Sequence, residues 1–404
     1  MQNTPNDWGF STLGDVILDK PQYGLTARSS TKINNTVYIR ISDITDEGQL
    51  KPENLHYVNL NSDEVGKYRL HENDFLIARS GSVGRVYLHH ALEKPAVFAS
   101  YLIRFRLDTQ KVLPKFVFYW GLSPDFNREI EARKKIVAQP NINAKDYCKF
   151  RLPVPRLQTQ RRIVSVLERA SNLKKRREQS NQLTNKIIQS VFLKMFGDPA
   201  NNPKGWEIVE LGEVIHELRY GTSVKCTSMP NGGIPVLRIP NIVRGLIELD
   251  GLKFSKLSEP DLTRYGLKDG DLLFVRTNGN REYVGRCAVF HEKGGPYAFA
   301  SYLIRARLQQ KRLNPDFVAV LLSFSASRNQ LFLRARTSAG QYNINTEGIR
   351  SIKIVVPPLS LQEKFVLVLS NYAKLRRRQQ ESESEINLLF QSLMHKAFRG
   401  ELVS

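Results

Sequence analysis

Side chains that can hydrogen-bond to nucleic acid occur at matching places in the two halves of the chain. Arg79 and Ser80 in the first half correspond to Arg276 and Thr277 in the second. The pattern Gln-x-Asn-Ile-Asn also occurs in both halves, at residues 139–143 and 341–345. Arg can bind guanine, and Asn or Gln adenine, through paired hydrogen bonds in the major groove, whereas Ser, Thr and Lys mostly position phosphates. These residue types suit contacts with a nucleic acid.

The overall charge favours the same kind of partner. The 404 residues include 60 Lys and Arg against 39 Asp and Glu, which gives a formal net charge of +21. A chain of this length holds two or three domains with their own cores. Such a basic balance favours a polyanion, because neutralised phosphates release counterions. The alternative is a basic protein with no acidic ligand.

Patterns that a catalyst would need are missing from the sequence. There is no Gly-x4-Gly-Lys-Ser/Thr loop for a nucleotide, and no Asn/Asp-Pro-Pro-Tyr/Phe run of the kind found in amino-methyltransferases. Pro124-Asp125 followed by Glu131 comes nearest to a metal-nuclease pattern, but it lacks a Glu-x-Lys pair. Pro and Asp are both favoured where a helix begins, so we interpret this run as a helix N-terminus.

The remaining composition predicts a cytoplasmic chain without a membrane partner. Cys148, Cys226 and Cys287 are far apart, which suits a reducing compartment and gives no metal-ligand spacing. No run of about 18 apolar residues is present, so a membrane span is not expected. The first residues carry no basic-then-apolar signal segment.

One long helix is predicted from Arg156 to about Phe196. Apolar or small residues recur there at steps of three and four, at Ile163, Leu167, Ala170, Ile188, Val191 and Met195. The middle of the same seam is polar, at Lys174, Arg177, Asn181 and Thr184. This spacing places the side chains on one face of a helix. Such a helix would extend ~50–60 Å, which is too long for an ordinary surface helix. Its apolar face must therefore pack against another part of the protein.

The end of the chain repeats this seam. Its apolar positions are Phe365, Leu369, Tyr372, Ile386, Phe390, Leu393 and Ala397, and its polar middle contains Arg376, Gln379 and Glu383. Two long helices with matching seams are most simply packed together as a coiled-coil pair. The alternative is two independent amphipathic helices, each lying on its own domain.

The segments before the two helices are also repeated. Phe98–Arg104 is identical to Phe299–Arg305, Tyr23-Gly24 matches Tyr220-Gly221, and each copy reaches its helix through a proline-marked joint. Short β-branched and aromatic runs predict strands at 37–41, 75–79, 83–88 and 100–106. Helices are expected at Pro114–Ile130 and at Pro315–Arg334. The fold class is therefore predicted as α+β, with a mixed sheet or small barrel in each copy.

The chain resembles the specificity subunit of a type I restriction–modification system over essentially its whole length. The resemblance is carried by the repeat and by local runs in a fixed order: Arg79-Ser80-Gly81, Val83-Gly84-Arg85, Gln-x-Asn-Ile-Asn, the helix entries at 155–163 and 357–364, and the helix exits at 195–199 and 397–402. Thr159-Gln160 departs from the more usual Glu-Gln at the first entry.

This resemblance implies two target-recognition domains, at 1–155 and 199–357, each reading half of a bipartite, asymmetric DNA sequence. It implies two spacer helices, at 156–198 and 358–404, that pair antiparallel. Two modification subunits and further restriction subunits would join the chain. S-adenosylmethionine, ATP and Mg²⁺ would belong to those partners, so the chain itself would be non-catalytic and bind no cofactor. A non-specific nucleic-acid adaptor or scaffold remains the alternative.

The residues expected to meet double-stranded DNA are Arg40, Arg79, Ser80, Arg85, Gln139, Asn141, Asn143, Arg238, Arg276, Thr277, Asn278, Asn280, Arg281, Arg286, Gln341 and Asn343. Those that recur in both halves cannot distinguish two half-sites, so they suit backbone contacts or loop bracing. Asn278, Asn280 and Arg281 suit base readout.

Each of these side chains also has a structural interpretation. An arginine could lie on a solvated face or form an internal salt bridge, and Asn143 and Asn345 are well suited to cap a helix. The basic clusters at 174–177 and 376–378 could contact the DNA backbone or simply face solvent.

Overall fold

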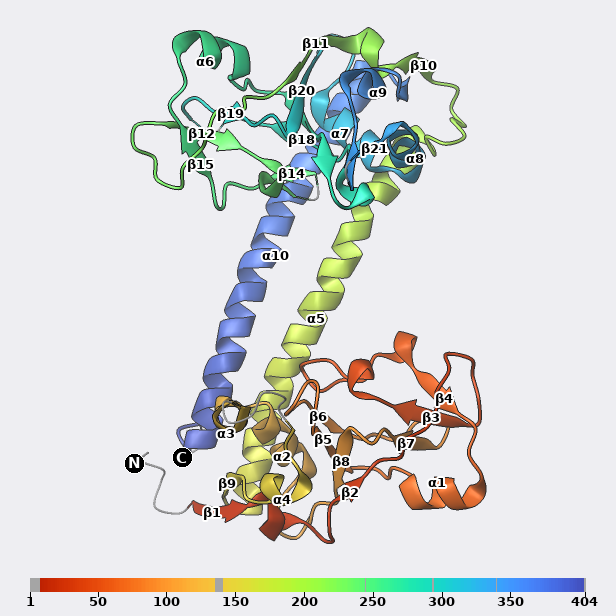
Figure 1. Ribbon diagram of the computed structural model, residues 1–404, viewed down its shortest axis with the longest axis vertical. Helices are drawn as coiled ribbons and strands as arrows, with labels where there is room; N and C mark the ends of the chain where they lie inside the picture. The colour runs from red at the N-terminus through yellow and green to blue at the C-terminus, as the bar shows by residue number, and fades with distance from the viewer. Residues whose placement is uncertain (1–7, 135–140, 244, 293, 339, 403–404) are drawn as a thin grey trace. The chain divides into compact units, whose positions relative to one another are not determined.

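The computed structural model describes residues 8–134, 141–243, 245–292, 294–338 and 340–402 (Figure 1). The chain forms two compact units. Unit 1 comprises Met1–Ser180 with Gln379–Ser404, and unit 2 comprises Asn181–Arg378. Each unit therefore combines one globular half with a portion of both long helices. The domain boundaries expected from the sequence divide the chain differently and stay a prediction.

Unit 1 contains two small sheets and a pair of strands. The four-stranded sheet has the order β2 (Gln22–Tyr23), β8 (Leu102–Phe105), β5 (Phe75–Ala78), β6 (Val86–Leu88). The three-stranded sheet has the order β4 (His56–Val58), β3 (Thr36–Ile39), β7 (Ala96–Phe98), and β1 (Gly9–Thr12) pairs with β9 (Arg151–Val154). The α-helices before the first long helix are α1 (Ser62–Tyr68), α2 (Pro114–Gly121), α3 (Pro124–Lys134) and α4 (Ala144–Tyr147).

Unit 2 repeats this plan strand for strand. Its four-stranded sheet is β11 (Ile215–Tyr220), β20 (Leu303–Leu308), β16 (Asp271–Val275), β18 (Cys287–Phe290), and its three-stranded sheet is β15 (Lys253–Ser255), β12 (Ile234–Leu237), β19 (Ala298–Phe299). Strand β10 (Glu207–Glu210) pairs with β23 (Lys353–Val356). The α-helices between the long ones are α6 (Glu259–Tyr265), α7 (Pro315–Ser323), α8 (Ser325–Arg334) and α9 (Thr346–Arg350). Because β3–β7 and β12–β19 are parallel pairs among antiparallel ones, the predicted mixed α+β fold is confirmed.

Unit 2 also contains a hairpin and a small third sheet. The hairpin pairs β13 (Ile242–Val243) with β14 (Leu246–Ile247). The third sheet has three strands in the order β17 (Thr277–Asn278), β22 (Gln341–Asn343), β21 (Arg336–Ser338). At the matching place in unit 1, the described residues form a single bridge between Ser80 and Asn141. The pairing of Ser80 with Asn141 matches that of Thr277 with Asn343 in unit 2.

Each helix predicted before a long helix is in fact two helices, so that prediction was wrong. In unit 1 the break comes before Pro124, which cannot continue the hydrogen-bond ladder and disfavours helical backbone at Ser123. In unit 2, Phe324 is extended between α7 and α8, with its ring 4.6 Å from that of Phe192. Packing on the long helix overrides the local helical pattern there.

The two long helices form as predicted, α5 over Leu157–Phe196 and α10 over Leu359–Arg399. In unit 1, the start of α5 buries Ile163 in the same core as Ala397 near the end of α10. In unit 2, the rings of Phe192 and Phe365 lie 5.4 Å apart, so the end of α5 meets the start of α10. The helices therefore pair antiparallel within each unit, and the alternative of independent helices is wrong (Figure 1).

A buried glutamine fixes each long helix to its globular half. Gln160 is fully buried; its Oε1 accepts from the Leu113 N–H at 2.8 Å, and its Nε2 donates to the carbonyls of Lys111 and Pro155. Gln362 makes the equivalent bonds in unit 2, to the Asn314 N–H and to two backbone carbonyls. This glutamine belongs to the helix entries that carried the resemblance, and its role is structural.

Candidate DNA-binding interface

An arginine stacked on a tyrosine occupies the same place in both units. In unit 1, the Arg79 guanidinium lies 4.8 Å from the centre of the Tyr23 ring, and the Tyr23 hydroxyl accepts from the Ala144 N–H. In unit 2, Arg276 lies 4.8 Å from the ring of Tyr220, whose hydroxyl accepts from the first N–H of α9. We call these the arginine–tyrosine pairs. Each pair fixes a planar cation in a defined orientation.

The glycine after each tyrosine explains how the pair is held. A Cβ on Gly24 would lie 2.2 Å from the Phe98 carbonyl oxygen, and one on Gly221 would lie 2.3 Å from the Ala300 carbonyl oxygen. Only glycine fits this close approach. The Tyr-Gly segment is therefore pressed against the start of the segment that is identical in the two halves.

In unit 1, the predicted residues near the pair line one pocket of about 510 Å³. The predicted residues among its lining are Arg40, Arg79, Ser80 and Asn141. The Arg79 Nε donates to the Asn141 Oδ1 at 3.2 Å, which ties the two segments that the sequence singled out. The structure thus brings these candidates together.

Two arginines of unit 1 have internal partners. Arg40 pairs with the fully buried Asp43 at 2.7 Å, and Arg85 pairs with Asp46 and donates to the Ile41 and Ile44 carbonyls. The internal salt-bridge interpretation is confirmed for both. Their contact with DNA stays a prediction.

In unit 2, the small three-stranded sheet β17-β22-β21 joins the two predicted segments. Thr277 Oγ1 donates to Gln341 Oε1 at 2.9 Å, and Thr277 pairs with Asn343 in the β17–β22 ladder. The Asn343 amide donates to the Gln341 carbonyl oxygen at 3.2 Å. The Arg276 Nη1 donates to the Ser301 carbonyl oxygen at 3.3 Å, whereas its counterpart Arg79 bonds to an asparagine. Equivalent arginines therefore have different neighbours in the two units.

The loop that follows β17 is braced by its own side chains. The Asn278 Oδ1 accepts from the Asn280 N–H, and the Asn280 Oδ1 accepts from the Glu282 N–H, both at 2.8–2.9 Å. Exposed Arg281 donates to the Phe332 carbonyl oxygen at 3.0 Å. These bonds hold the loop in one shape while each side chain keeps further hydrogen-bonding capacity.

The remaining candidates have mainly local partners. Arg238 donates to the Gly251 carbonyl oxygen, and Arg286 donates to the Glu282 carbonyl oxygen while lying 4.0 Å from the Tyr283 ring centre. Asn143 and Asn345 cap α4 and α9, as their structural interpretation predicted. Gln139 lies outside the described residues. Of the basic cluster at 174–177, Lys174 pairs with Glu47 at 3.5 Å.

Buried charge supports the central strand of unit 2. Arg305 is fully buried and pairs with Glu217 at 2.8 Å, while Arg307 bonds to Glu217 and to buried Asp271. Burial opposes the charged form of Glu217, yet Arg305 and Arg307 hold the pKa of this carboxyl below its ordinary value. This network fixes β20, which begins within the identical segment Phe299–Arg305.

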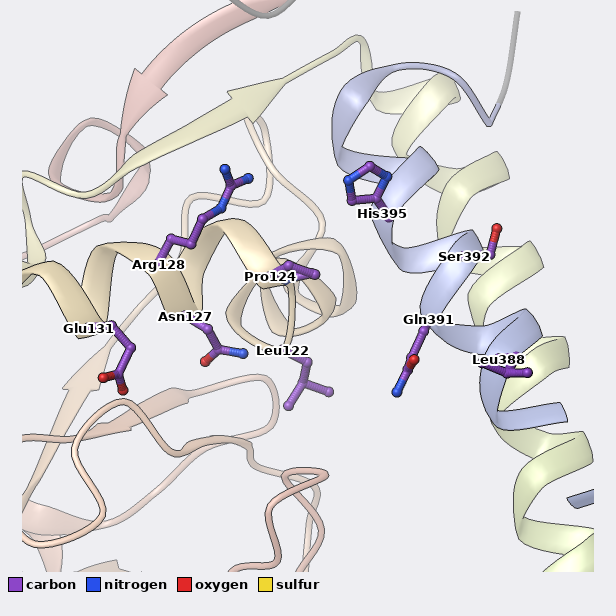
Figure 2. Close-up of a pocket in the computed structure, with 9 residues that line it drawn as sticks. All are labelled: Leu122, Pro124, Asn127, Arg128, Glu131, Leu388, Gln391, Ser392 and His395. Carbon is purple, nitrogen blue, oxygen red and sulfur yellow. The ribbon is translucent and has the colours of Figure 1, made fainter. Parts of the chain in front are cut away.

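A second pocket of unit 1, about 700 Å³, lies between α3 and the end of α10 (Figure 2). Pro124 and Glu131 of the nuclease-like run line it, and Asp125 pairs with Arg128. Helix α3 begins at Pro124, so the interpretation of this run as a helix N-terminus is confirmed. Over the described ranges, no group of three or more His, Cys, Asp or Glu side chains could hold a metal ion. In the same ranges, no helix has the length and apolar character to cross a bilayer.

The model of the family "Type I restriction modification DNA specificity domain" matches residues 5–185 and 203–388. The chain belongs to this family. It is 29% identical over 321 residues to the Type I restriction enzyme EcoKI specificity subunit of Escherichia coli K12, covering 72% of this chain and 67% of the relative. It is 24% identical to the StySPI specificity subunit of Salmonella potsdam over 72% of this chain and 66% of the relative. The match thus spans about two thirds of these relatives.

Solved structures share the fold of this specificity subunit. The type I restriction–modification S subunit from M. genitalium has a TM-score of 0.59 at 16% identity. The match covers 98% of this chain and 98% of that one. A chain from a structure describing complex assembly and conformational transition of the type I system has a TM-score of 0.60 at 19% identity, over 100% of both chains. Specificity subunits are the non-catalytic, DNA-recognising component of such systems, and the predicted function is confirmed at this level.

The sequence reasoning missed four residues of this specificity subunit. Tyr23 and Tyr220 hold the stacked arginines, and Tyr101 and Tyr302 lie exposed beside them. The signal was present, because all four belong to segments that match between the halves. A match between the halves does not by itself distinguish a residue of the site from one of the scaffold.

Proposed function

We propose that the chain reads a bipartite, asymmetric duplex DNA site, with each globular half contacting one half-site. The observation that carries this proposal is the arginine–tyrosine pair, which has the same geometry in both units but different neighbours. A common scaffold with different loops is what two readers of different sequences require. The net charge of +21 supports a phosphate backbone as the ligand.

Within this proposal, the residues divide into two roles. Arg79 and Arg276 recur, so they position the DNA backbone or brace the reading loops. The side chains that differ between the units read base edges. In unit 2 these are Asn278, Asn280 and exposed Arg281. Thr277, Gln341 and Asn343 have counterparts in unit 1, so they contact the DNA backbone or brace the loop. In unit 1, Ser80 and Asn141 line the pocket beside Arg79.

The proposal extends to the partners of the chain. Two modification subunits and the restriction subunits join it in the cytoplasm. S-adenosylmethionine, ATP and Mg²⁺ serve those subunits, and this chain binds no cofactor. The antiparallel helix pair then separates two recognition domains at 1–155 and 199–357, and its length sets the number of unread base pairs between the half-sites.

A base-resolution map of DNA methylation tests the function directly. Cells with this gene intact are compared with cells that lack it. We expect a split motif of two short half-sites to lose its methylation on deletion, and a plasmid-borne copy to restore it. If the modification partner co-purifies with the chain but no motif depends on the gene, the chain is not a specificity determinant and the adaptor interpretation replaces it.

A further inference from the structure

The segment that is identical in the two halves contains one residue that the fold does not explain. In Phe98–Arg104, the side chains of Phe98, Ala99, Leu102 and Ile103 are buried, and Arg104 pairs with Asp74. Tyr101 instead exposes 62% of its surface. A core position explains why a residue type recurs, but an exposed aromatic position does not.

The second copy shows the same pattern. Phe299, Ala300, Leu303 and Ile304 are buried, Arg305 is fully buried in its ion-pair network, and Tyr302 exposes 57% of its surface. In both copies the tyrosine lies in the turn that joins a strand of the three-stranded sheet to one of the four-stranded sheet. Two large aromatic side chains are therefore presented to solvent at equivalent positions.

The backbone places each tyrosine next to an arginine–tyrosine pair. The Arg79 N–H donates to the Tyr101 carbonyl oxygen at 2.9 Å, and the Arg276 N–H donates to the Tyr302 carbonyl oxygen at 2.9 Å. In unit 1, Tyr101 also lines the pocket that holds Arg79, Ser80 and Asn141. The exposed ring thus belongs to the surface where the candidate DNA contacts gather.

We propose that the Tyr101 and Tyr302 rings each insert at one base-pair step of a half-site and make a sequence-independent stacking contact there. This inference rests on the DNA-reading function proposed above. A residue shared by both units cannot choose between two sequences, so its contact must be one that any nucleotide can accept. Ser, Thr or Lys would suffice for a phosphate, whereas a flat ring can enter between two neighbouring base pairs of a duplex and stack there, a contact that reads no base edge.

The test uses the full-length chain with Tyr101→Ala, Tyr302→Ala and the matched Tyr→Phe variants. Fluorescence anisotropy compares a duplex carrying the mapped motif with a duplex of shuffled sequence, at several salt concentrations. Because both rings are exposed, the variants should keep the wild-type melting temperature, which is checked first.

Each alanine variant should bind both duplexes roughly ten- to a hundredfold more weakly, as loss of a stacked ring does. The phenylalanine variants should stay within about threefold of wild type, because the ring remains. The slope of log affinity against log salt should not change, since no charge is removed. Equal losses for alanine and phenylalanine would assign the contact to the hydroxyl and overturn the stacking proposal.

The two proposals fail in different ways. If alanine variants bind like wild type while Arg79→Ala weakens binding, only the stacking contact is wrong. If the wild-type chain binds neither duplex, the DNA-reading function itself fails and the stacking contact fails with it.

Discussion

The two units share their scaffold but differ in the groups around it. The sheets correspond strand for strand, and both arginine–tyrosine pairs have the same 4.8 Å spacing. Arg79 bonds to Asn141 in one unit, whereas Arg276 bonds to the Ser301 backbone in the other. Under the proposed function, the scaffold fixes where recognition happens, while the neighbouring loops set what is recognised.

The strongest test of the shared scaffold concerns its buried glutamines. Gln160→Ala should destabilise the chain by roughly 3 kcal/mol, because it strands the Leu113 N–H and two carbonyls without partners. Gln362→Ala should cost a similar amount through unit 2. Urea unfolding measures both, with exposed Gln158→Ala as the control on the same helix turn. A Gln160→Ala variant as stable as this control would show that the hydrogen bonds of Gln160 do not stabilise the attachment of the long helix.

A difference between the units appears in their response to acid. Buried His89 of unit 1 and Phe290 of unit 2 occupy equivalent positions. The His89 carbonyl oxygen accepts from the Asn73 N–H, and the Phe290 carbonyl oxygen accepts from the equivalent Gly270 N–H. Burial lowers the pKa of His89 from 6.5 to about 4. Below pH 6.5 the unfolded chain takes up a proton that the folded unit does not, so stability falls as the pH drops towards 4.

Replacing this histidine should remove that acid sensitivity. His89→Phe should spare unit 1 about 2 kcal/mol of the stability lost between pH 7 and pH 5. Unit 2 provides the contrast, because a hydrogen bond to Asp316 raises the pKa of His291. The stability that protonated His291 gains from this pair is present at low pH and is lost as the pH rises through its folded-state pKa. Denaturant unfolding at several pH values measures both, and an unchanged pH profile for His89→Phe would contradict the assignment.

Substituting the stacked arginines should have a smaller effect, on DNA affinity for every sequence, whereas substitutions in the loops should change which sequence is bound. Arg79→Ala and Arg276→Ala should each weaken duplex binding by about tenfold for any sequence, and each should reduce the salt slope by about 1. Arg79→Lys keeps the charge but loses the planar stack on Tyr23, so it should recover the salt slope without full affinity. A loss confined to one DNA sequence would instead make these arginines base readers.

Much of this architecture could be predicted because it repeats. Matching seams predicted both long helices to within a few residues, and the repeated motifs predicted two similar units. The helix break in unit 1 has a local signal in Pro124. The break in unit 2 could not be predicted from local pattern, because Phe324 is held extended by packing on Phe192, which is distant in sequence. Arg40 and Arg85 have the right chemistry for DNA. Arg40 has its internal partner Asp43 only three residues along the chain, whereas the partner of Arg85, Asp46, is brought to it by the tertiary fold.

The candidate site was harder to predict than the fold. Sequence spacing singled out Arg79 and Asn141 without showing that they touch. It did not single out Tyr23 or Tyr101, because a repeated aromatic residue can be either buried or exposed.

The central claim is that the two units read their half-sites independently, and one variant tests it most directly. Methylation is mapped at base resolution in cells carrying Arg281→Ala, beside cells carrying Lys311→Ala, an exposed charge of the same unit outside the loop. We expect Arg281→Ala to relax the base preference in one half-site and to leave the other half-site and the spacer unchanged. Lys311→Ala should keep the full motif. An unaltered motif, or a change in both half-sites, would contradict it.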